Sequence, residues 1–117
     1  MVEIYHNDKF MDYALRNYTT PQDERRIGGT TVHQVATVDT DNLNMAYQLT
    51  NHIDSDWTKN AGVRMSPSIK TARSTSVGDI LRHDRRLYAV ETFGFREIGR
   101  EEECDIVFHI PDLKKAL

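Results

Sequence analysis

Two strand-like runs, residues 80–83 and 87–91, lie close together in the C-terminal half of the chain. Both runs are rich in apolar side chains, and Asp84 between them is a natural turn former, so they predict an antiparallel hairpin. Arg85 is a poor residue for a two-residue turn, which leaves a longer loop open. Residues 93–95 (Phe-Gly-Phe) place two rings around a glycine, which is typical of a strand corner. The hairpin therefore predicts an antiparallel sheet.

The rest of the chain predicts further strands and two helices. Strand patterns occur at residues 2–6, 31–39 and 105–110. Mostly apolar side chains at i, i+3, i+4 and i+7 predict helices at residues 9–16 and 43–50. This order predicts an α+β fold: a mainly antiparallel sheet, two helices packed on one face and a long irregular loop before a C-terminal hairpin. A chain of 117 residues is expected to form one domain, residues 1–117.

Residues 51–75 form the expected long loop, which is rich in Ser, Thr, Gly and Pro. Connections of this length are uncommon in compact domains and often carry function. Trp57 is the only tryptophan, and its large ring is expected to pin the loop to the core. We also count Trp57 among the candidate partner-binding residues, because residues 54–73 are one of two surfaces expected to meet a partner.

Charge is unevenly distributed along the chain. The net charge is −5 for residues 1–57, +5 for residues 58–100 and −3 for residues 101–117. In one interpretation the three parts fold together and neutralise one another. In the other, a basic face meets an anionic partner. The basic candidates for partner binding are Arg64, Lys70, Arg73, Arg82, Arg85 and Arg86.

Few residues suggest catalysis or metal binding. His52, Asp54 and Asp56 are the best metal candidates, although the same residues suit a helix end followed by a polar turn. Ser74, Thr75 and Ser76 could hold a phosphate beside Arg73, but backbone capping is the favoured interpretation. No cofactor loop or recognised ligand spacing occurs, so we expect no cofactor and no bound metal.

Other patterns limit the possible functions further. Cys104 is the single cysteine, which excludes an intramolecular disulfide. Neither a secretory signal nor an apolar run of membrane-spanning length is present, so we expect a cytoplasmic protein with no membrane partner. Aromatic side chains alternate with arginine at Tyr88, Phe93, Phe95 and Arg96. This pattern could stack bases, but core packing is favoured.

The segment from Arg73 to Ile98 resembles the YodL-like family of small proteins from bacteria, plasmids and phages. The resemblance rests on Arg73-Ser-Thr-Ser-Val-Gly-Asp-Ile80, Leu87-Tyr-Ala-Val90 and Phe93-Gly-Phe-Arg-Glu-Ile98, and the block extends over about residues 32–98. Thr92 departs from the small residue that usually precedes Phe93. The resemblance implies a bacterial cell as the setting and transfers no catalytic residue.

These observations predict a small non-enzymatic binding protein of a phage or mobile element that docks on a host protein. Docking would modulate host machinery or defence. The first alternative is a nucleic-acid-binding accessory protein that uses the basic hairpin around Arg82, Arg85 and Arg86. The second is a small enzyme with a site at His52, Asp54 and Asp56. A homodimer is also possible if residues 105–110 form an exposed edge strand.

Overall fold

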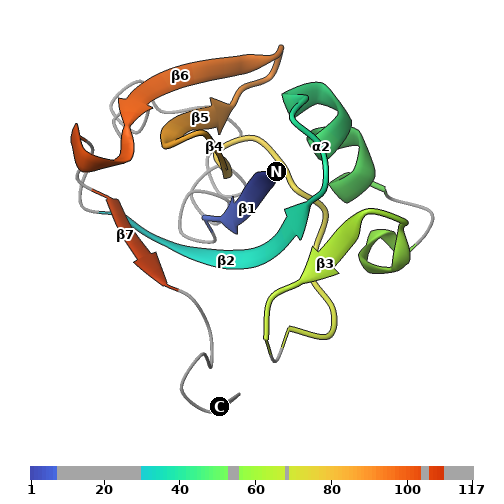
Figure 1. The fold of residues 1–117 in the computed structure, drawn as a ribbon. Coiled ribbons are helices and arrows are strands. Elements are labelled where there is room, and N and C mark those ends of the chain that lie inside the picture. Colours follow the sequence, from blue (N-terminus) through green and yellow to red (C-terminus); the bar gives the residue numbers. More distant parts are fainter. Residues whose placement is uncertain (8–29, 53–55, 68, 104–105, 110–117) are drawn as a thin grey trace.

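A computed structural model describes residues 1–7, 30–52, 56–67, 69–103 and 106–109 (Figure 1). The helix expected at residues 9–16 lies outside this part of the chain, as do Asp54 and Cys104. The elements are β1 (Val2–His6), β2 (Thr30–Val38), α2 (Leu43–Thr50), η2 (Trp57–Lys59), β3 (Val63–Met65), β4 (Ile80–His83), β5 (Arg86–Val90), β6 (Phe95–Arg100), η3 (Glu101–Glu103) and β7 (Ile106–His109).

The strands form one sheet in the order β3-β2-β1-β4-β5-β6, and all neighbours in this order are antiparallel. β7 pairs in parallel with the start of β2, whereas β3 pairs with the end of β2. The chain leaves β6 through η3 and returns to β2 as β7, so the sheet curls round (Figure 1). The prediction of an α+β fold with a mainly antiparallel sheet is confirmed. The described residues contain one α-helix and two short 3-10 helices.

Each face of the sheet carries a hydrophobic core. Val2 and Ile4 of β1 point to the face that α2 covers, whereas Tyr5 belongs to the core on the other face. The core under α2 consists of Val2, Ile4, Val35, Ala36, Val38, Ala46, Trp57, Leu81 and Val90. The opposite core consists of Tyr5, Val32, Ile80, Leu87 and Ala89. Because both faces of the sheet are buried, apolar residues occur at odd as well as even positions along a strand.

The predicted helix at residues 43–50 is confirmed as α2. Asn42 caps its start, because the side-chain oxygen accepts a hydrogen bond from the backbone N–H of Met45 at 3.0 Å. Ala46 and Thr50 are fully buried on its inner face. Tyr47 meets Phe95 edge to face, with ring centroids 6.0 Å apart. The helix is thereby fixed against the end of the sheet where β6 begins.

The predicted hairpin is also confirmed, and its loop is the shorter of the two possibilities. Asp84 and Arg85 alone join β4 to β5, and both have positive φ, 53° and 66°. Turns with two left-handed residues match the strand twist and normally use Asn-Gly or Asp-Gly. Arg85 therefore occupies a glycine position, at a backbone cost of about 1–2 kcal/mol.

Two strands differ from the sequence predictions. The expected irregular loop, residues 51–75, contains η2 and the short strand β3. The expected corner at residues 93–95 is instead the tip of a second hairpin, and it is followed by β6. No helix in the described part of the chain is long and apolar enough to cross a membrane.

Candidate functional site

The segment Arg73–Asp79 is a packed structural node. Asp79 is fully buried, and its carboxylate accepts hydrogen bonds from Arg73 Nη1 at 2.7 Å and Nη2 at 2.8 Å. It also accepts from the backbone N–H groups of Asn7 at 2.8 Å and Ser76 at 2.7 Å. One carboxylate thus joins the end of β1 to the start of β4. The role of this segment is to hold the sheet together.

The hydroxyl groups of the same segment are engaged locally. Ser74 donates to the backbone carbonyl of His52 at 2.8 Å, and Ser76 donates to the carbonyl of Ser74 at 3.1 Å. Thr75 Oγ1 lies 3.1 Å from His6 Nε2, and both residues are buried. These contacts favour backbone capping over a phosphate site.

His6, Thr75 and Asp79 do not have the geometry of a catalytic triad. The ring nitrogen that contacts Thr75, Nε2, is the one that lies 3.9 Å from Asp79 Oδ2. A triad needs the acid on the other ring nitrogen, so that the imidazole is oriented as a base toward the nucleophile. Thr75 is also fully buried and cannot meet a substrate.

Trp57 lies in the core, with 2% of its surface exposed. Its indole N–H donates to the backbone carbonyl of Arg73 at 3.1 Å. The ring therefore anchors the segment around η2 to the node. It does not lie on the surface where a partner-binding residue would be needed.

The predicted metal candidates form no site in the described residues. His52 and Asp56 are exposed, and Asp54 lies outside this part of the chain. Asp56 caps η2, accepting from the backbone N–H of Thr58 at 3.1 Å. Hydrogen bonding to Thr58 lowers the pKa of the Asp56 carboxyl. No group of three potential metal-ligating side chains occurs among the described residues.

Three of the six basic candidates form ion pairs. Arg73 binds Asp79, and Arg86 Nη1 lies 3.2 Å from Glu97 Oε1. Arg82 bridges two carboxylates, with Nη1 at 2.5 Å from Glu3 and Nε at 2.6 Å from Glu101. The Nε contact is an ion pair and is not a well-directed hydrogen bond. Arg64, Lys70 and Arg85 are exposed and have no carboxylate within ion-pair distance among the described residues.

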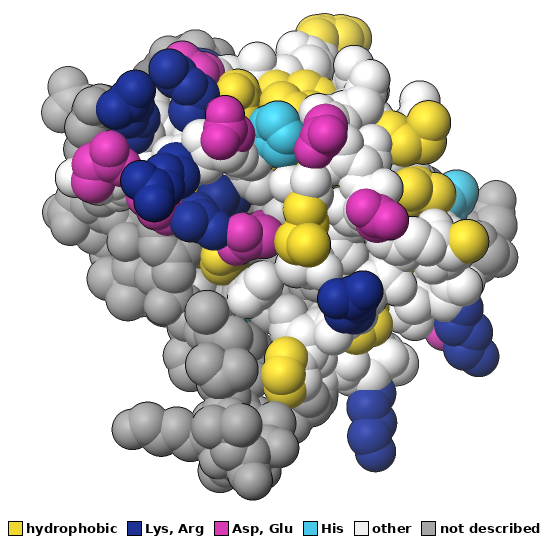
Figure 2. Space-filling view, viewed as in Figure 1, with side chains coloured by type: hydrophobic (Ala, Val, Ile, Leu, Met, Phe, Trp, Pro, Cys, Tyr) yellow, Lys and Arg dark blue, Asp and Glu magenta, His cyan; other side chains and the backbone are white. Residues whose placement is uncertain are grey.

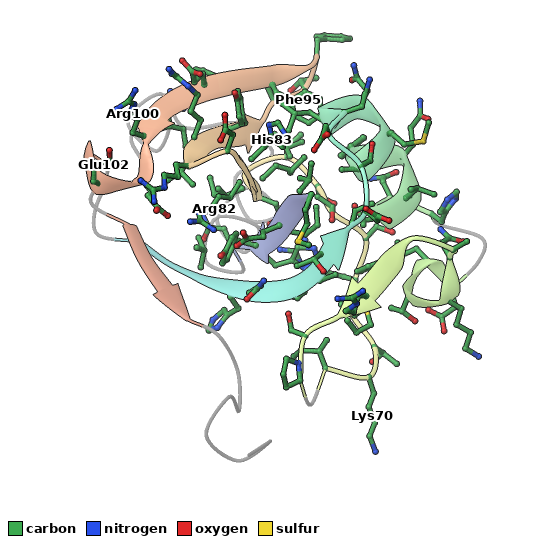
Figure 3. The ribbon with its side chains drawn as sticks, viewed as in Figure 1. Lys70, Arg82, His83, Phe95, Arg100 and Glu102 are labelled. Carbon is green, nitrogen blue, oxygen red and sulfur yellow. The ribbon has the colours of Figure 1, made fainter. Side chains whose placement is uncertain are left out.

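Acidic and basic side chains therefore both occur on the β5–β6 ribbon. Figure 2 shows them interspersed at the upper left, and Figure 3 labels Arg82, Arg100 and Glu102 at the same end of the sheet. Lys70 projects at the opposite end of that view. The mixed charge favours the interpretation in which the oppositely charged parts of the chain neutralise one another.

One face of the β5–β6 ribbon carries both aromatic and charged groups. Register places Val90 opposite Phe95, Tyr88 opposite Glu97 and Arg86 opposite Arg100. We call this surface, together with the tip of the ribbon, the β5–β6 face. It consists of Arg86, Tyr88, Phe93, Phe95, Glu97 and Arg100. Tyr88 and Phe95 pack against the core under α2, as the aromatic pattern predicted.

Phe93 differs from the other aromatic side chains, because 94% of its surface is exposed. It stands at the tip between β5 and β6, where the backbone N–H of Glu91 donates to the carbonyl of Gly94 at 3.0 Å. Gly94 has a φ of +82°, which suits a tight turn. The sequence analysis placed this ring in a strand corner and favoured core packing for it, and the core prediction is wrong for Phe93. The available signal was its position between two turn-compatible residues, Thr92 and Gly94.

The functional interpretation of the chain rests on its own residues. No family model, curated protein or solved structure matches the chain.

Proposed function

We propose that this protein is a non-enzymatic binding protein that docks on another protein through the β5–β6 face. The observation that carries the proposal is Phe93, a nearly fully exposed aromatic ring on the tip of a paired hairpin. The proposed setting is a bacterial cell, with a phage or mobile element as the source and a host protein as the partner, as the YodL-like resemblance implies.

The exposed ring supports docking because its position provides little stability to the fold. Burying a phenylalanine side chain contributes about 1.5–3 kcal/mol of favourable free energy. A partner that covers Phe93 would gain this free energy on binding. Aromatic side chains on rigid elements are typical anchors of protein interfaces. The tip is held by strand pairing and by the packing of Phe95 on Tyr47, so docking would order few additional groups.

The charges around the ribbon favour a protein partner over nucleic acid. Four basic side chains there face five acidic ones, so this end of the molecule has no net positive charge. The residues counted are Arg82, Arg85, Arg86 and Arg100 against Glu3, Asp84, Glu97, Glu101 and Glu102. Non-specific affinity for nucleic acid depends on neutralising several phosphates with free cations.

The proposal is tested by capturing partners from a nuclease-treated bacterial lysate with tagged wild-type protein and with Phe93→Ser. Thr92→Ser is the matched control, because it changes an exposed neighbour on the same tip. We expect one protein in near-stoichiometric amount with the wild type and the control, and at least tenfold less of it with Phe93→Ser. Equal recovery by Phe93→Ser would refute docking through this tip. Recovery of nucleic acid alone, without nuclease, would favour the nucleic-acid alternative.

A further inference from the structure

We infer that Arg85 is a specificity residue that binds an acidic side chain of the protein partner, assisted by Arg86 and Arg100. This inference rests on the proposed docking function. It concerns the other end of the same ribbon and identifies the chemical group that the partner places there. Phe93 lies at one end of β5, and the turn Asp84–Arg85 lies at the other.

The first observation is the backbone conformation of Arg85. Its φ of 66° follows a φ of 53° at Asp84, so both turn residues are left-handed. Glycine fits this second position without steric cost, whereas a long side chain does not. A residue held in a sparsely populated conformation points to a role outside the fold. The Arg85 side chain is exposed, and its charge acts on the nearby Glu101 carboxylate, but it has no carboxylate within ion-pair distance among the described residues.

The second observation is a like-charge pair beside this turn. Arg86 lies directly opposite Arg100 in the β5–β6 register, an arrangement that destabilises a sheet. Each has one exposed carboxylate neighbour, Glu97 at 3.2 Å and Glu102 at 3.9 Å. Such exposed single contacts are weak and readily exchanged. Two unfavourable features, at Arg85 and at the Arg86–Arg100 pair, thus occur at one end of the ribbon.

The guanidinium groups at this end are attached to hydrogen-bonded backbone. The backbone N–H of Glu101 donates to the carbonyl of Arg85 at 2.9 Å, which joins η3 to the turn. A planar guanidinium on a fixed backbone binds a carboxylate through two parallel hydrogen bonds. The nearby acidic residues repel an extended polyanion but leave this short-range contact available. An acidic side chain on a protein surface is therefore the ligand that fits best.

The spacing of the two ends is compatible with one partner. Phe93 lies eight positions after Arg85 in the sequence, which corresponds to roughly 25 Å of extended chain. A typical interface buries about 800 Å² on each side, an area of similar width. The partner is thus expected to combine an apolar pocket for Phe93 with an acidic residue near Arg85.

The test uses the full chain labelled with ¹⁵N-arginine, and the probe is a short peptide with a single glutamate, acetyl-Gly-Glu-Gly-amide. Titration at low salt is followed at the arginine Nε–H signals for wild type, Arg85→Gly, Arg85→Lys and the distant control Lys59→Ala. We expect saturable shifts of the Arg85, Arg86 and Arg100 signals, at least fivefold weaker binding for Arg85→Gly, and less than twofold change for Lys59→Ala. Arg85→Lys is expected to be intermediate, because it keeps the charge and loses the bidentate contact.

The same samples give a readout that distinguishes binding from a structural role. Arg85→Gly is expected to raise the melting temperature while it weakens peptide binding. A lower melting temperature would show that Arg85 supports the fold, and would overturn the inference. Equal peptide binding by Arg85→Gly, or tighter binding of a single-stranded oligonucleotide than of the peptide, would also overturn it. The Phe93 capture experiment does not involve this probe, so failure of the docking proposal remains distinguishable.

Discussion

Replacing Asp79 with asparagine is expected to destabilise the protein more than any surface change. The carboxylate is fully buried and accepts four hydrogen bonds, two of them from the Arg73 guanidinium. Asparagine has the same shape, but its amide nitrogen would face donors, and the negative charge that Arg73 contacts at this position would be lost. Breaking a buried ion pair in this way costs about 3–5 kcal/mol. Because the Arg73 side chain is 30% exposed and can be partly hydrated, we expect a loss near the lower limit.

The loss is measured by thermal and urea unfolding of the full chain. For 117 residues, an unfolding entropy of about 2.1 cal/mol/K per residue converts 3 kcal/mol into a decrease of roughly 12 °C in Tm. Glu97→Gln is the matched control, since it removes one carboxylate from the exposed pair with Arg86 and should cost about 1 kcal/mol or less. If Asp79→Asn is no more destabilising than this control, the node does not hold the sheet together.

Three further predictions concern stability and pH. Trp57→Phe should cost about 2 kcal/mol in urea unfolding, because it shrinks a buried ring and leaves the carbonyl of Arg73 without its N–H donor; a change under 0.5 kcal/mol would contradict this. The ion pair with Arg82 lowers the pKa of Glu101 below its ordinary 4.5, so this pair stabilises the fold above that pH and the contribution is lost as the pH falls; Arg82→Met should flatten the stability profile below about pH 5. Burial, with help from Glu3, raises the pKa of Tyr5, so stability should fall above about pH 10, where the unfolded phenol ionises first; ultraviolet titration should detect ionisation of Tyr5 only on unfolding.

The elements that the sequence predicted well have strong local signals. The helix at residues 43–50 combines an apolar stripe with a capping asparagine, and the β4–β5 hairpin combines two apolar runs with an aspartate. β6 was missed because a bulge breaks its alternation. Tyr88 pairs with Glu97 and Leu87 with Gly99, which leaves Ile98 as an extra residue. β3 was missed because it has three residues and Arg64 at its centre.

The candidate site was harder to predict because its charges are compensated by distant residues. Arg82 looked like part of a basic hairpin, but its partner Glu3 is 79 positions away in the sequence. Arg73 likewise resembles a surface cation in the sequence, but in the structure the buried Asp79 carboxylate neutralises its charge. Charge counts along a chain cannot show which cations are neutralised, since pairing depends on strand order. Exposure of Phe93 has the same origin, because the pairing of β5 with β6 places this residue at the tip of the ribbon.

The node is connected to the β5–β6 face through the paired strands β4 and β5. Asp79 stands directly before β4, and its bonds to Arg73 and Asn7 fix the start of that strand against the end of β1. β4 in turn pairs with β5, and β5 with β6, so the two tips of the ribbon have fixed positions relative to the core. A rigid ribbon loses little conformational entropy when a partner binds. Loosening the node should therefore weaken the proposed docking, although the node lies outside the β5–β6 face. Among single variants that remain folded, affinity for the captured protein should then decrease in parallel with loss of amide protection in β4.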